Sequence, residues 1–107
     1  MGFTREQTLP EVIRAAARQD LFELEYLIDN GAPVNSRGEY GETALHWAAI
    51  SGRVDIAQLL LDRRIDTRIV DCNDRTAAEV ALRYGHPQVQ ELIRRETIEM
   101  GSKGRRR

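Results

Sequence analysis

The feature that most limits how this chain can fold is an internal repeat of 33 residues. Residues 43–52 read T-A-L-H-W-A-A-I-S-G and residues 76–85 read T-A-A-E-V-A-L-R-Y-G. Identical residues stand 33 positions apart at Thr43 and Thr76, Ala44 and Ala77, Ala48 and Ala81, and Gly52 and Gly85. A repeat of this length is one supersecondary unit, and it buries its apolar face only when neighbouring units stack against it.

Each unit contains two short helical patterns separated by a turn. In the middle unit, Leu45, Ala48 and Ala49 share one helical face, Gly52 follows, and residues 54–61 carry a second apolar stripe. Glycine suits the reversal because it tolerates a positive φ. In the first unit Ala16-Ala17 meets Ala48-Ala49 at an offset of 32, which predicts that this unit lacks one residue near Asp20.

The period and the motif resemble the ankyrin repeat family. T-A-L-H-W-A at 43–48 is similar to the family signature T-P-L-H-x-A, and G-A-P-V-N at 31–35 is similar to its G-A-D-V-N link. The resemblance implies an all-α solenoid of three helix-turn-helix units with hairpin-like loops, at about 8–37, 38–70 and 71–100, which form one domain over 1–100. It also implies that Thr43 and His46 brace the loop and helix start, a bracing altered where Glu79 replaces the histidine.

Both ends of the array are predicted from local signals. Thr8-Leu9-Pro10-Glu11 is typical of a capping box that starts the first helix, and the last helical pattern places polar residues between its apolar ones. These signals predict a complete small protein. The basic segment 101–107, with four bases and no acid, is expected to be disordered. It is either a solvated charge run or a weak electrostatic contact with an acidic protein or nucleic acid.

The residues that carry catalysis or bind metals are scarce. Cys72 is the single cysteine, and the two histidines, His46 and His86, occupy repeat positions, so a cysteine nucleophile has no dedicated base. The histidines, cysteine and acids have no zinc or calcium ligand spacing, and there is no glycine-rich phosphate loop. We therefore expect no enzyme, no cofactor and no metal.

The cellular setting is predicted from the same inventory. No apolar run approaches the roughly 18 residues that a membrane-spanning helix needs. A lone cysteine excludes an internal disulfide framework, and the first residues lack the apolar segment of a signal peptide. We expect an intracellular protein, in the cytoplasm or nucleus, that is a monomer on its own and contacts no membrane.

Candidate partner-binding residues lie where the repeat pattern imposes no requirement. Proteins of the resembled family bind partners through loop tips and the concave side of the first helices. On this sequence those positions include Arg37, Glu39, Tyr40, Glu42, Ile50, Ser51, Cys72, Asn73, Arg75, Arg83 and Tyr84. Tyr40, Arg75, Arg83 and Tyr84 lead, because tyrosine and arginine are frequent interface hot spots. Trp47, where the family usually has leucine, is predicted to pack in the core with its indole edge on the concave side.

Two functions remain open. The chain is either a free-standing interaction module, an adaptor or stoichiometric regulator whose concave face and loop tips bind another protein, or an accessory structural subunit built permanently into a larger multi-protein or ribonucleoprotein assembly. The small surface of three repeats lies near the lower limit for a stable complex. The sequence does not identify the partner.

The end of the second unit departs from the pattern of the first. Arg63-Arg64-Ile65-Asp66 stands where Asn30-Gly31-Ala32-Pro33 stands one repeat earlier. If Arg64 takes the left-handed conformation that glycine adopts easily, it carries backbone strain of about 1 kcal/mol. The sequence leaves a second reading, in which the Arg63-Arg64 pair is kept for a partner.

Overall fold

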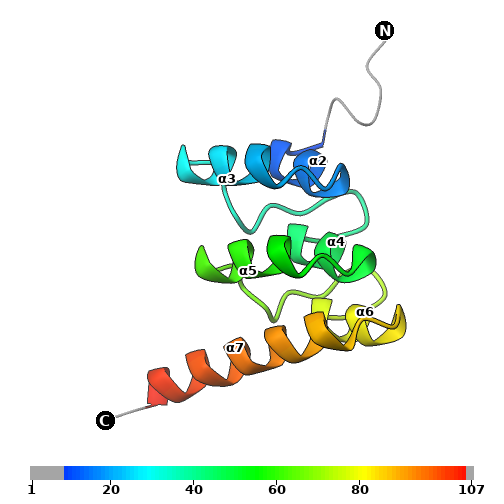
Figure 1. Cartoon of the computed structure of the whole chain (residues 1–107), viewed down its shortest axis with the longest axis vertical. Coiled ribbons are helices and arrows are strands. Elements are labelled where there is room, and N and C mark those ends of the chain that lie inside the picture. Colours follow the sequence, from blue (N-terminus) through cyan, green and yellow to red (C-terminus); the bar gives the residue numbers. More distant parts are fainter. Residues whose placement is uncertain (1–8, 106–107) are drawn as a thin grey trace, which may run out of the picture.

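The structure, a computed structural model, describes residues 9–105, with side chains described up to Glu99. Over these residues the chain forms helices and no strands. Three helical pairs stack one above another along the chain, from the pair nearest the N-terminus to the pair nearest the C-terminus (Figure 1). The helices are α2 (Glu11–Ala17), α3 (Leu21–Asp29), α4 (Ala44–Ser51), α5 (Val54–Asp62), α6 (Ala77–Arg83) and α7 (Pro87–Arg105).

The core runs continuously through the stack. Within each pair the two helices pack on each other, and α4 also packs on α2 and α6, while α5 packs on α3 and α7. The buried apolar side chains come from every pair and include Leu24, Leu45, Leu60, Val80 and Ile93. The middle pair is therefore covered from both sides, as expected for a unit that relies on its neighbours to complete the core.

The 33-residue register continues without a gap through the first unit, contrary to the prediction that this unit lacks one residue. Ala15 and Ala16 are buried and Ala17 is exposed, so Ala15-Ala16, not Ala16-Ala17, fills the positions of Ala48-Ala49. The small side chains that allow the helices to approach closely therefore lie one residue earlier than the alignment of Ala16-Ala17 with Ala48-Ala49 predicted. Gln19 then falls on the position of Gly52.

The turn inside each pair uses a left-handed residue. Gly52 has φ 73° and Gly85 has φ 80°, as the glycine punctuation predicts, while Gln19 has φ 60° at the equivalent place in the first pair. Gly52 is further constrained because a Cβ added there would lie 2.6 Å from the ring Nδ1 of His86. Close approach of the next repeat and the backbone conformation both favour glycine at this turn.

The two ends differ from their predictions. Helix α2 begins at Glu11 with Pro10 as its N-cap and no side-chain cap, so the capping box expected from Thr8 does not start it, and Thr8 lies outside the described residues. Helix α7 continues to Arg105, over five of the seven residues for which we expected disorder. Among the described residues, no helix has both the length and the apolar character needed to cross a membrane.

Arg63 joins the outer helices of the first two pairs. Its Nε and Nη2 donate to the two carboxylate oxygens of Asp29, at 2.7 and 3.0 Å, and its Nη2 also donates to Glu25 at 3.1 Å. The hydrogen bond and the charge of Arg63 lower the pKa of Asp29, although desolvation opposes the change. Bidentate geometry of this kind fixes orientation. These internal contacts give Arg63 a structural role that needs no partner.

Arg64 is left-handed, with φ 67°, so the condition under which the sequence predicts backbone strain is met. Its side chain is exposed, and Gly31 holds the equivalent position in the first pair with φ 103°. We expect Arg64→Gly to raise the melting temperature by about 2–5 °C, because relief of left-handed strain outweighs the entropy that glycine adds to the unfolded chain. Thermal circular dichroism measures this midpoint. An unchanged or lower value would mean that Arg64 makes a contact worth more than the strain.

Candidate functional site

Two loops, residues 38–42 and 71–75, stand side by side at the ends of α4 and α6. The amide of Cys72 donates to the carbonyl of Tyr40 at 2.9 Å, which ties the second loop to the first. The guanidinium of Arg37 donates to the carbonyl of Gly41 in the first loop and to that of Val70, the residue just before the second loop. The hydrogen bonds leave the loop tips at a fixed spacing.

His46 connects the second repeat to the third. Its Nδ1 accepts from the amide of Thr43 at 3.0 Å, and its Nε2 lies 2.9 Å from the carbonyl oxygen of Arg75. Since a carbonyl can only accept, Nε2 carries the ring proton and the imidazole is the neutral Nε2–H form. Both ring nitrogens of this buried side chain are thus used, in agreement with the bracing role that the resemblance implied.

In the third repeat, Glu79 makes the contact to the threonine at the helix start but, within the part of the chain that the structure describes, not the contact to a neighbouring loop. Its carboxylate accepts from the amide of Thr76 at 2.9 Å, while the amide of Glu79 donates to the Thr76 hydroxyl at 3.3 Å. This is a capping box. Among the described residues the Glu79 side chain makes no bond to another loop, so the bracing is altered as expected.

A pocket of about 320 Å³ opens between the loops and the first helices of the second and third repeats. Its walls come from the two loops, α4, α6 and the residue Leu9 before α2. The lining residues are Leu9, Glu39, Tyr40, Glu42, His46, Trp47, Ile50, Asp71, Asn73, Arg75, Val80, Arg83 and Tyr84. We call this surface the loop–helix face.

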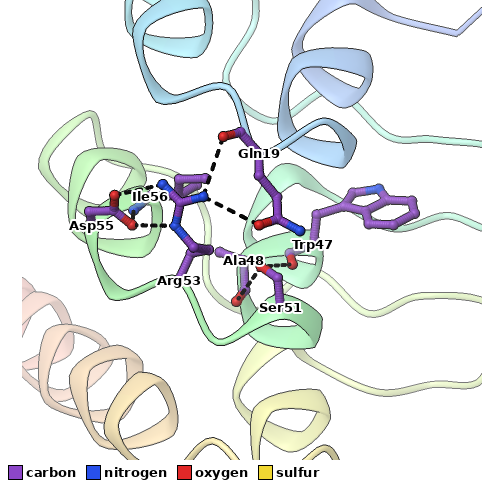
Figure 2. A network of polar contacts seen from close by, with 7 residues as sticks. All are labelled: Gln19, Trp47, Ala48, Ser51, Arg53, Asp55 and Ile56. Carbon is purple, nitrogen blue, oxygen red and sulfur yellow. Dashed lines mark hydrogen bonds and ion pairs between the residues drawn. The ribbon is translucent and has the colours of Figure 1, made fainter.

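Trp47 and Glu42 form the polar corner of the pocket. The indole Nε1 of Trp47 donates to one carboxylate oxygen of Glu42 at 3.1 Å, and the amide of Tyr40 donates to the other at 2.9 Å. Figure 2 shows the Trp47 ring directed away from the Arg53–Asp55 ion pair, which lies on the other side of α4. Trp47 is half-buried against the core, as predicted, and its ring forms part of the pocket wall.

Most of the predicted partner-binding residues meet at this pocket. Those that line it are Glu39, Tyr40, Glu42, Trp47, Ile50, Asn73, Arg75, Arg83 and Tyr84. Glu42 differs from expectation in being only 8% exposed, so its carboxylate positions other groups rather than offering itself to a partner.

The other predicted residues lie outside the pocket lining. Arg37 is engaged with loop carbonyls. The hydroxyl of Ser51 donates to the carbonyl of Trp47 at 3.0 Å, within its own helix (Figure 2). Cys72 is exposed. These three side chains lie next to the pocket lining or hold nearby backbone in place, and none of them lines the pocket.

Four lining residues were absent from the predicted set: Leu9, His46, Asp71 and Val80. Val80 stands 33 residues after Trp47, so the repeat offset could have identified it. Asp71 accepts from the amides of Asn73 and Arg75 at 2.9 and 3.1 Å and shapes the loop. No sequence signal brings Leu9, which precedes α2, to this wall.

The described residues hold no group of three or more histidine, cysteine, aspartate or glutamate side chains that could bind a metal ion. Most polar contacts around the pocket join side chains to loop backbone, and one joins the Trp47 and Glu42 side chains, an arrangement that fixes the shape of a surface. This geometry suits recognition of a partner by side-chain insertion and hydrogen bonding.

Comparison with known proteins connects this architecture to a family. The family described as ankyrin repeats (3 copies) matches residues 12–103. The chain is 36% identical over 87 residues to the putative ankyrin repeat protein of Rickettsia bellii, a match that covers 80% of this chain and 47% of the relative. It is 43% identical over 54 residues to the Acyl-CoA-binding domain-containing protein 1 of Arabidopsis thaliana, covering 50% of this chain and 16% of that protein.

A further relative is the human NAD-capped RNA hydrolase NUDT12, 31% identical over 80 residues, a match that covers 74% of this chain and 17% of the relative. The chain thus spans about half the length, or less, of the curated relatives it matches. Ankyrin repeats are generally protein–protein interaction modules and are generally not catalytic. With the helix-turn-helix stack, the T-A-L-H motif and a match across residues 12–103, this chain belongs to the ankyrin repeat family.

Proposed function

We propose that this chain is a non-catalytic adaptor or stoichiometric regulator that binds another protein through the loop–helix face, the side expected to be concave from the family resemblance. The observation that carries the proposal is the pocket itself. Aromatic, aliphatic and arginine side chains from two repeats and two loops converge there, and tryptophan, tyrosine and arginine are the residue types that dominate interface energetics. The loop-to-loop hydrogen bonds support a surface organised before binding, which lowers the entropy cost of association.

Substitution of the exposed tyrosines tests the proposal. Tyr40 and Tyr84 are 61% and 54% exposed, so truncating their side chains removes little packing from the core. We expect Tyr40→Ala and Tyr84→Ala each to weaken binding of the native partner at least about tenfold, because truncating a central aromatic often costs about 2 kcal/mol or more. Melting temperatures should stay within about 3 °C of the wild type. Pull-down of the native partner followed by titration measures the effect.

The matched control is Gln58→Ala on α5. Gln58 is exposed and its amide donates to Asp62 on the same helix, so the substitution removes a polar surface contact away from the pocket. It should change neither binding nor the melt. If Gln58→Ala disrupts the complex while the tyrosine variants bind normally, the interface is on the outer helices and the proposal is wrong.

A second candidate is an accessory subunit held permanently in a larger assembly. It is favoured by two exposed aromatics one turn apart on α3, Phe22 and Tyr26, at 80% and 64% exposure. Neither lines the pocket, so an integral subunit would have a second apolar surface to cover. In the same pull-down, loss of the complex with Phe22→Ser but not with Tyr40→Ala would favour this candidate over the adaptor.

A further inference from the structure

The pocket offers a ligand hydrogen-bond donors more than acceptors. Both oxygens of Glu42 already accept hydrogen bonds, from Tyr40 and Trp47, and one oxygen of Asp71 accepts two. Glu39 is not free either. Both oxygens of Glu42 and one oxygen of Asp71 are thus engaged within the protein.

The two guanidinium groups of the pocket are not engaged in this way. Within the described residues, the side chains of Arg75 and Arg83 make no hydrogen bond or ion pair, although both line the cavity. An arginine presents five N–H donors in a planar fork that matches a carboxylate. The unused donors therefore define what a ligand must supply, namely oxygen acceptors that carry negative charge.

Most of the remaining wall is apolar or aromatic. Trp47, Ile50, Val80 and the two tyrosines surround a volume of about 320 Å³, near the small end of the range for ligand pockets. A space of this size suits one bulky apolar side chain of a partner rather than a large cofactor. Aromatic and arginine side chains that line one pocket are the residue types expected around an anchor residue.

We propose that the pocket binds an acidic linear segment of the partner protein, with one bulky apolar side chain inserted beside Trp47 and neighbouring carboxylates paired with Arg75 and Arg83. This inference rests on the proposed function and adds the chemistry of the partner. Glu39, Glu42 and Asp71 lie in the same wall and repel any acidic ligand, so they oppose a nucleic acid, which carries a charge at every nucleotide, more than a peptide that carries few charges. A peptide can place its few charges on the arginines alone.

Trp47 provides the readout. It is the single tryptophan of the chain and forms part of the pocket wall, so its fluorescence reports occupation of the pocket. The probes are a blocked peptide Gly-Glu-Asp-Phe-Asp-Glu-Gly, its amide counterpart with Gln and Asn, its alanine-centred counterpart, a lysine counterpart, and a single-stranded oligonucleotide. We expect the acidic phenylalanine peptide to bind about tenfold or more tightly than each of the others, because charge-assisted bidentate bonds and the apolar anchor act together. Added salt should weaken it.

Arginine variants test the assignment of the donors. We expect Arg75→Gln and Arg83→Gln each to reduce the preference for the acidic peptide over its amide counterpart at least about threefold. Arg68→Gln is the matched control, since Arg68 is an exposed arginine outside the pocket that pairs with Asp66, and it removes the same charge. All three variants should melt within a few degrees of the wild type. Arg68→Gln should keep the preference.

Several outcomes overturn the inference. These are equal binding of the acidic and amide peptides, preference for the lysine peptide or the oligonucleotide, no fluorescence change with millimolar acidic peptide, or equal effects of Arg68→Gln and Arg83→Gln. Failure here is distinct from failure of the proposed function. If the tyrosine variants lose the native partner while Arg75→Gln and Arg83→Gln retain it, the binding role stands and the acidic peptide does not.

Discussion

A fragment that begins at Gly38, and so lacks the first repeat, is expected to lose its cooperative melt and most of its helical circular dichroism. In the intact chain α2 packs on α4 and α3 packs on α5, so the fragment would uncover one whole side of the middle pair. The fragment keeps about 70 residues, a size at which a single core rarely supplies more than about 3–5 kcal/mol. Losing an entire repeat interface exceeds that margin.

The polar contacts across the same interface account for little of this effect. These contacts lie at exposed or partly exposed positions: Arg63 pairs with Asp29 and Glu25, Asn35 accepts from the amide of Asp66 at 2.8 Å, and Arg53 reaches the carbonyl of Gln19 at 3.4 Å. Exposed ion pairs add little to stability because water screens them. In the full chain, Asn35→Ala should therefore keep a cooperative melt and lose only about 1 kcal/mol. A Gly38 fragment that melts cooperatively with full helical signal would show that two repeats suffice and that the interface is weaker than its packing suggests.

The repeat architecture could be predicted because the residue types that it requires recur along the sequence. Small alanines where helices meet, glycine at the turn and leucine or isoleucine toward the core repeat every 33 residues. The first repeat was misaligned by one residue because Ala15, Ala16 and Ala17 offer two possible pairs. The burial of Ala15 and Ala16 settles the register, and the backbone places Gln19 in the left-handed conformation of the turn. The misalignment hid this position, because Gln19 falls on the turn glycine Gly52 only when Ala15-Ala16 is aligned with Ala48-Ala49.

The sequence predicted most residues of the candidate site but not the hydrogen bonds among them. Loop tips and first-helix positions identified most of the pocket, because the repeat places them on one face. The structural roles of Arg37 and Glu42 could not be predicted from their repeat positions. Both are residue types usually given to solvent, yet here one bridges loop carbonyls and the other is buried against Trp47 and Tyr40. The Arg37–Val70 contact joins positions 33 residues apart, and the Glu42 contacts depend on how its loop folds back against α4, neither of which side-chain identity alone specifies.

Replacing His46 by alanine is expected to destabilise the fold by about 3 kcal/mol. The change leaves the amide of Thr43 and the carbonyl of Arg75 without their buried partner, and each such group costs about 1–3 kcal/mol, in addition to the space left by a fully buried ring. For a domain of this size the melting temperature should fall by about 10–20 °C. Urea unfolding followed by circular dichroism measures the free energy of unfolding directly.

Two companion variants separate the local cap from the link between repeats. Glu79→Ala removes only the capping box of the third repeat, where the equivalent side chain bonds Thr76, and should cost about 1 kcal/mol. His46→Asn keeps an acceptor near the position of Nδ1 but is too short to reach the carbonyl of Arg75, so its stability should lie between those of the wild type and His46→Ala. If His46→Ala costs no more than Glu79→Ala, the bond from Nε2 to the Arg75 carbonyl contributes nothing, and packing alone joins the second and third repeats. If His46→Asn is as destabilised as His46→Ala, the link between repeats carries most of the histidine's contribution, and the loops that form the pocket depend on it.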